Sequence, residues 1–143
     1  MSSSSKINFG SHARRVLLLA TVAVTVAANT STALPRNETF AVLYAFGSQQ
    51  GDGIGPSVDV RDRSGNLYGR TFSGGAHGQG TVFKLTPGGA ETVLYSFCNR
   101  QNCNDGAQPN TNLVLDKKGA IFGTTQTGGK FNKGVVFAVK PDG

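Results

Sequence analysis

Apolar and β-branched residues occur in short runs after residue 33, and clusters of glycine, proline and aspartate separate these runs. This alternation is typical of β-strands joined by turns. It predicts strands at about 58–62, 66–71, 80–85 and 91–97, and again at about 113–116, 120–125 and 134–139. The segment 39–46, TFAVLYAF, has the same strand content.

The polar residues between the runs specify tight turns. Asp62 and Gly65 begin and end one four-residue turn, and Asp116 and Gly119 do the same further along the chain. Aspartate in the first position and glycine in the fourth suit a type I turn between antiparallel strands. Each pair of flanking strands is therefore predicted to form a hairpin.

The chain contains a tandem repeat. The stretch 66–85, NLYGRTFSGGAHGQGTVFKL, returns in altered form at 120–139 as AIFGTTQTGGKFNKGVVFAV. Upstream of each copy, an L-Y-x-F segment precedes an Asp-Gly pair and a proline. We therefore divide the β-repeat domain, 34–143, into repeat units of about 39–89 and 90–143.

Loop length predicts how the strands pair, because strands joined by tight turns pair with each other and the long connection 97–113 should leave the sheet. One sheet then has four antiparallel strands between 58 and 97. The second has three, which leaves an open edge at 134–139. The segment 39–46 could complete that edge as a fourth strand, in the way that propellers close their rings.

The motif series L-Y-x-F, D-G-x-x-P, D-x-x-G, Y/F-G-x-T, G-G, G-x-V-F and P-x-G occurs twice in order over 39–143. It resembles the GloVer (Gloeobacter/Verrucomicrobia) tandem repeats of exported bacterial proteins. The resemblance implies an all-β fold of two four-stranded antiparallel propeller-type blades, with a repeat length similar to that of kelch blades. It supplies no catalytic residues and no ligand.

Two blades cannot close a ring, since closed propellers have about four to eight. We expect a fragment of a longer propeller, a two-blade unit that assembles with copies of itself, or an open pair of sheets. The end of the sequence on KPDG, a turn with no strand after it, favours the fragment.

Residues 1–33 have the pattern of a secretory signal peptide. Lys6, Arg14 and Arg15 precede an apolar run at 16–28, and small residues favour cleavage after Ala28 or Ala33. The run is shorter than the roughly 20 residues that a membrane-spanning helix needs. We expect a secreted protein located outside the cell or at its surface, and the periplasm is a further location that fits this pattern. The alternative is that the segment stays uncleaved and serves as a membrane anchor.

The formal net charge of +6 overstates the basicity of the exported chain. The 14 basic residues, less the three of the export segment, leave 11 against 8 acidic ones, and these are scattered along the sequence. Nucleic-acid binding needs basic residues gathered on one face, so we do not expect that function.

The two cysteines, Cys98 and Cys103, lie in the long connection with four residues between them. Export to an oxidising compartment favours a disulfide. A zinc site would need two further ligands and no histidine lies near in sequence; free thiols are the third possibility. Neither a metal site nor a cofactor is expected.

The sequence predicts no catalytic residue. Residues that take part in function are best sought at the positions where the two copies differ. The variable surface candidates are His77 against Phe131, Gln79 against Lys133, and Arg70 against Thr124. The glycine-rich loop 74–80 lacks the Lys-Ser/Thr or helix start of a phosphate loop. These observations favour a binding or scaffold module for a glycan or protein ligand, with self-association open. The alternative is a propeller-type carbohydrate hydrolase or lyase.

Overall fold

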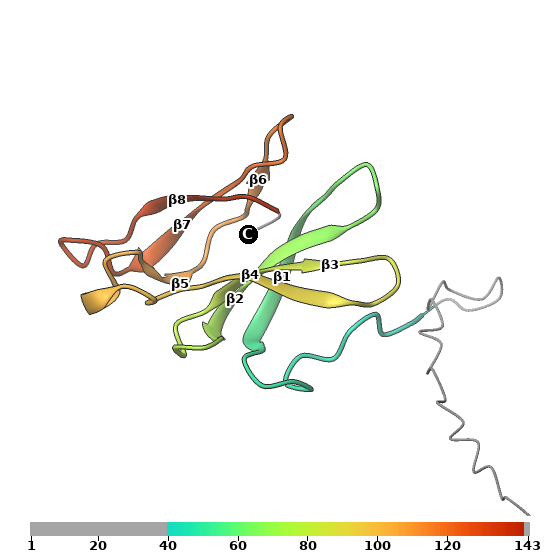
Figure 1. The fold of residues 1–143 in the computed structure, drawn as a ribbon, viewed down its shortest axis with the longest axis horizontal. Helices are drawn as coiled ribbons and strands as arrows, with labels where there is room; N and C mark the ends of the chain where they lie inside the picture. Colours follow the sequence, from blue (N-terminus) through green and yellow to red (C-terminus); the bar gives the residue numbers. More distant parts are fainter. Residues whose placement is uncertain (1–39, 142–143) are drawn as a thin grey trace, which may run out of the picture.

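A computed structural model describes residues 40–141 and contains two antiparallel β-sheets with a single three-residue 3-10 helix (Figure 1). The all-β prediction is confirmed. The expected signal peptide, 1–33, lies outside the described residues. Within 40–141, no helix is long and apolar enough to cross a membrane.

The first sheet has the predicted four strands in sequence order. They are β1 (Gly53–Arg61), β2 (Leu67–Gly74), β3 (Thr81–Leu85) and β4 (Glu91–Ser96). The turn between β1 and β2 forms as predicted, with the Gly65 N–H donating to the Asp62 carbonyl over 3.1 Å. Gly65 has φ of 86°, a conformation that favours glycine. Each hairpin thus follows from its turn residues.

Strand β1 begins at Gly53, five residues before the predicted start at 58. Its first part, GIGPS, has the glycine and proline content of a loop. Proline is tolerated here because β1 is an edge strand, where a missing N–H leaves no gap in the ladder between inner strands.

The second sheet also has four strands, but two of them are short. They are β5 (Ala107–Pro109), β6 (Val114–Leu115), β7 (Ile121–Thr127) and β8 (Val136–Val139). β5 and β6 pair with opposite ends of β7, on the edge away from β8. Together they take the place that β1 has in the first sheet. Among the described residues, no strand pairs with the outer edge of β8.

The strand registers repeat between the sheets. Pro56 lies opposite Thr71 in the first sheet, and Pro109 lies opposite Thr125 in the second. The equivalence of the two repeat units is therefore structural as well as sequential.

The segment 39–46 was predicted to be a strand that could complete the second sheet, but the described part of it, 40–46, forms no strand, and the prediction is wrong. The ring of Phe46 packs against that of Phe83, with 4.9 Å between centroids. Because neighbouring residues of a strand face opposite sides and Val82 faces the second sheet, Phe83 faces away from it. The segment is thus held on the far side of the first sheet from β8 (Figure 1).

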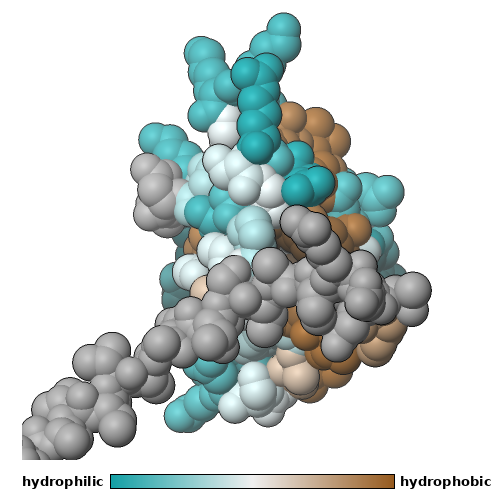
Figure 2. Space-filling model, turned by 90° about the vertical axis from the view of Figure 1, so that its right-hand side faces the viewer, coloured by the Kyte–Doolittle hydropathy of each residue, from teal (hydrophilic) through white to brown (hydrophobic). Residues whose placement is uncertain are grey.

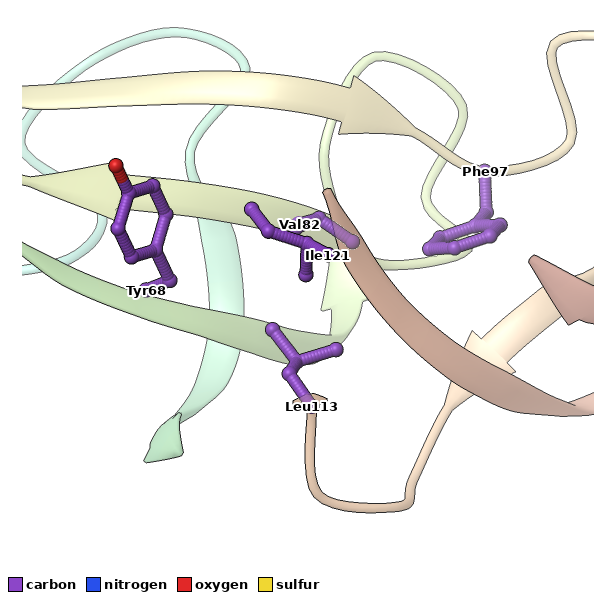
Figure 3. Close-up of a cluster of buried hydrophobic side chains, with 5 residues drawn as sticks. All are labelled: Tyr68, Val82, Phe97, Leu113 and Ile121. Atoms are coloured by element: carbon purple, nitrogen blue, oxygen red, sulfur yellow. The ribbon is translucent and has the colours of Figure 1, made fainter. Parts of the chain in front are cut away.

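The two sheets share one hydrophobic core. Its buried members are Tyr68, Val82, Phe97, Leu113 and Ile121, and they come from both sheets and from the connection between them (Figure 3). Burying these side chains stabilises the contact between the sheets, at about 25 cal/mol per Å² of apolar surface. Neither sheet closes on itself, and no ring is formed within 40–141.

Candidate functional site at the loop end of the sheets

The two ends of the sheets differ. One end carries tight turns, such as 62–65 and 116–119, whereas the other carries the longer connections. Three of these connections meet: the β2–β3 loop, the disulfide-containing segment before β5, and the β7–β8 loop. They line a hollow of about 560 Å³. We call it the loop-end hollow; its polar lining is Gln79, Asn102, Asn104, Thr127, Lys130 and Asn132.

Paired glycines shape both hairpin loops beside the hollow. Gly75 and Gly129 occupy equivalent positions, with φ of 77° and 75°. A Cβ on Gly75 would lie 2.6 Å from the Thr81 methyl group, so both the backbone conformation and the packing require glycine. The repeated Gly-Gly motif therefore serves backbone geometry.

The predicted disulfide joins Cys98 to Cys103. It brackets the 3-10 helix η1 (Gln101–Cys103), whose Asn102 has φ of 57°. The Cys103 carbonyl accepts hydrogen bonds from Gly106 N–H over 2.9 Å and Gly129 N–H over 2.8 Å. The disulfide loop thus fixes the β7–β8 loop across the hollow.

Asp105 holds the same loop in place through hydrogen bonds to its carboxylate. Its carboxylate accepts hydrogen bonds from the Tyr95 hydroxyl (2.7 Å), Asn99 N–H (2.9 Å) and Arg100 N–H (3.1 Å). Partial burial pushes the pKa of Asp105 upward, but these hydrogen bonds outweigh burial and leave it below its ordinary value of 3.8. Burial, followed by the bond to Asp105, raises the pKa of Tyr95 to about 12.

The first repeat contains the same arrangement. The Tyr44 hydroxyl lies 2.9 Å from both carboxylate oxygens of Asp52, which also accepts hydrogen bonds from Gly47 N–H and Gln49 N–H. Asp52 and Asp105 belong to the Asp-Gly pairs that recur upstream of each copy, and both carboxylates hold turns. Their tyrosine partners were missed. The signal was present in the sequence, because Tyr and Asp recur together in the two copies.

Two of the three candidate pairs, His77 with Phe131 and Gln79 with Lys133, lie in the loops at this end. Gln79 lines the hollow, and His77 in the same loop has Nε2 3.2 Å from Asn99 Oδ1. Phe131 is 77% exposed, and Lys130 Nζ lies 5.4 Å from its ring centroid. Lys133 is exposed in the β7–β8 loop. The structure brings loops of both repeats to one surface.

Arg70 differs from the other candidates, because it lies in β2 and its side chain is largely buried. Its Nε donates to the Thr111 carbonyl over 2.7 Å and lies 3.7 Å from Asp59 Oδ2. This placement corrects the prediction of Arg70 as a surface candidate. Arg70 ties the first sheet to the connection between β5 and β6.

The lining of the hollow defines its chemistry. Four of its side chains are amides, which both donate and accept hydrogen bonds. Lys130 supplies the charge in this lining, and no carboxylate contributes to it. Among residues 40–141, no group of three or more His, Cys, Asp or Glu is placed to hold a metal ion.

The sequence was compared with protein families, curated proteins and solved structures. The family model of the Gloeobacter/Verrucomicrobia repeat matches residues 25–143, which include both repeat units. The comparisons with curated proteins and with solved structures found no match. Together with the register repeated in the two sheets, the family match shows that the chain belongs to the Gloeobacter/Verrucomicrobia repeat family.

Proposed function

We propose that this chain is an exported binding module that presents the loop-end hollow to a glycan, outside the cell or at its surface. The observation that carries the proposal is the convergence of loops from both repeats on one amide-lined hollow. Its volume of about 560 Å³ lies in the range of ligand sites, about 300–1,000 Å³. The signal-peptide pattern of 1–33 and the disulfide support export.

The chemistry of the hollow suits a neutral, hydroxyl-rich ligand. Sugar hydroxyls donate and accept hydrogen bonds, and so do the side chains of Asn102, Asn104 and Gln79. Phe131, between the lining residues Lys130 and Asn132, offers an exposed aromatic face against which the apolar face of a sugar ring can pack. An acidic polymer would instead need several basic residues, and the lining has one.

The proposed module is built from two propeller-type blades. The four-stranded antiparallel sheet, the repeated register and the core between the sheets support this reading. In propellers, loops at one end of neighbouring blades lie side by side. The loop-end hollow spans two successive sheets in the same manner.

A carbohydrate hydrolase or lyase is the alternative. Glycoside hydrolysis normally uses two carboxyl groups that flank the scissile bond, and the hollow lining contains none. No observation in the described residues favours catalysis. A turnover assay on the bound polysaccharide is therefore a separate arm of the experiment.

The proposal is tested on a glycan array with the exported protein, followed by calorimetry with the glycan that gives the strongest signal. Phe131→Ala and Asn104→Ala should each weaken binding about tenfold, which corresponds to about 1.4 kcal/mol. Phe122→Ala is the matched control, because this exposed phenylalanine lies on β7 near the tight-turn end. It should bind like the parent.

Two results would overturn the glycan proposal. One is the absence of any glycan signal above background. The other is binding that Phe131→Ala and Asn104→Ala leave unchanged. Release of reducing sugar or of an unsaturated product from the bound polysaccharide would replace the binding module by the enzyme.

A further inference from the structure

We propose that residues 40–46 of a second copy of this chain add to the outer edge of β8 as a fourth strand. The proposal does not depend on the glycan ligand. It rests on the first sheet, in which the equivalent edge is already occupied. There β4 pairs with β3, and β4 with the Phe97 that follows it carries the same Leu-Tyr-x-Phe motif as residues 43–46.

The register of that pairing follows from the repeat. In the first sheet, Val82 lies opposite Tyr95 and Lys84 lies opposite Thr92. The positions equivalent to Val82 and Lys84 are Val136 and Ala138, and those equivalent to Tyr95 and Thr92 are Tyr44 and Ala41. The arriving strand should therefore place Tyr44 opposite Val136 and Ala41 opposite Ala138, antiparallel to β8.

The edge of β8 has a space for this strand. A groove of about 320 Å³ runs beside it, lined by the consecutive residues 135–139 and, across from them, by Tyr95, Phe97 and Asp105. Consecutive residues of a strand face opposite sides, so a groove that touches all of them follows the strand edge. Val136 is 79% exposed there. An apolar edge without charge or proline invites another strand.

The donor segment is equally unpartnered among the described residues. Residues 40–46 form no strand, and Phe40 and Val42 are 78% and 64% exposed. Figure 2, which views the side of the molecule where the described chain begins, shows apolar surface on this face. An exposed apolar donor and an exposed apolar edge of matching register can bury each other.

The existing contacts of the donor segment do not prevent the exchange. In the second repeat, Tyr95 belongs to β4 of the first sheet while its hydroxyl bonds Asp105, and Phe97 packs against Phe137 of β8 at 4.9 Å. One Tyr-x-Phe segment thus serves the preceding and the following sheet together. Tyr44 and Phe46 already make the equivalent contacts to the sheet that follows them in the sequence. The segment therefore remains available to pair, as a strand, with a sheet that precedes it.

The donor and the acceptor lie on opposite sides of the molecule (Figure 1). Phe46 holds the donor on the face of the first sheet turned away from β8. A strand that reaches β8 should therefore come from another copy, which gives a head-to-tail contact. Such contacts close into rings where the rotation between copies allows closure, and otherwise they form open filaments.

Disulfide trapping tests the register. The only two native cysteines are joined to each other, so introduced thiols can be followed on their own. Ala41→Cys and Ala138→Cys, made in separate chains, mixed and exposed to an added oxidant, should give a covalent dimer on a non-reducing gel. The matched control is Ala45→Cys mixed with Ala138→Cys, which lies out of register and should give little dimer. Equal cross-linking in both mixtures would contradict the proposal.

Light scattering tests the assembly. The exported protein should have a mass at least twice that of one chain. Val42→Asp or Val136→Lys should reduce this mass to the mass of one chain. Val114→Lys, also at an exposed valine in a strand, should keep the larger mass. A single-chain mass for the parent, or an assembly that both edge variants leave intact, would overturn the proposal. An intrachain disulfide in a monomeric Ala41→Cys/Ala138→Cys double variant would overturn it as well.

Discussion

The hydroxyl of Tyr95 donates a 2.7 Å hydrogen bond to Asp105 Oδ2, and this bond joins the last strand of the first sheet to the loop that begins the second. Phe97, two residues after Tyr95, packs on Phe137 of β8. The segment therefore completes one sheet and anchors the next. This double role explains why the repeat units defined by sequence begin one strand before the sheets that they build.

We expect Tyr95→Phe to lower the free energy of unfolding by about 1–2 kcal/mol, because the Asp105 carboxylate loses one of its hydrogen bonds. Urea denaturation of the parent and the variant measures the difference. Tyr44→Phe removes the equivalent bond to Asp52 from a segment that forms no strand, and it should cost less. A larger loss for Tyr44→Phe than for Tyr95→Phe would contradict this account.

The pKa of Asp105 predicts an acid-dependent stability. Because the pKa of this carboxyl is below its ordinary value in the folded protein, the stabilisation is present above the unfolded pKa and is lost as pH falls through the folded pKa. The free energy of unfolding should therefore decline below about pH 4. Asp105→Asn should be less stable near neutral pH and should show a shallower decline in this range. An unchanged acid slope would exclude Asp105 as a contributor.

The glycines of the β2–β3 loop predict a position-dependent cost for alanine. Gly78→Ala should lose about 1 kcal/mol of stability, since its φ is 74° but nothing lies within 4 Å of the added Cβ. Gly75→Ala meets the Thr81 methyl group as well, and overpacking should add roughly 1–3 kcal/mol. Thermal unfolding of both variants tests the order. Equal melting temperatures would show that the close packing at Gly75 adds nothing to the loss of stability.

The core between the sheets predicts that they unfold together. Ile121 is fully buried between them, so Ile121→Ala should cost about 2–5 kcal/mol. Val114→Ala, at a strand position that is 61% exposed, should change stability by less than about 0.5 kcal/mol. Urea denaturation followed by two probes, one in each sheet, should give coincident transitions. Separate transitions would contradict a shared core.

Much of the fold could be predicted from local chemistry. The Asp-x-x-Gly turns located both hairpins, and the tandem repeat identified the equivalent strands. The start of β1 was missed, because its glycine and proline residues are typical of loops. The whole of β5 was missed as well: its Gln-Pro sequence is typical of a loop, and it lies in the connection 97–113 that was predicted to leave the sheet. Edge strands and short ladders accept such residues, so composition alone does not distinguish them from loops.

The segment 40–46 shows why strand propensity was not sufficient. It has nearly the sequence of β4, but β4 forms because β3 offers it a partner. Among the described residues, 40–46 has no such partner. At the loop end, comparing the two copies identified Gln79 and its neighbours in the loops. It did not identify the asparagines of the hollow, because only the folded chain brings 102–104 beside 127–132.

We expect the loop ends of the two repeats to act as one binding face. Heteronuclear NMR of the exported protein, titrated with the glycan selected on the array, tests this expectation. We predict that amide signals of 79, 102–104 and 127–132 shift together and saturate, while those of the tight turns 62–65 and 116–119 stay in place. Shifts confined to the tight-turn end, or spread evenly over both ends, would contradict it.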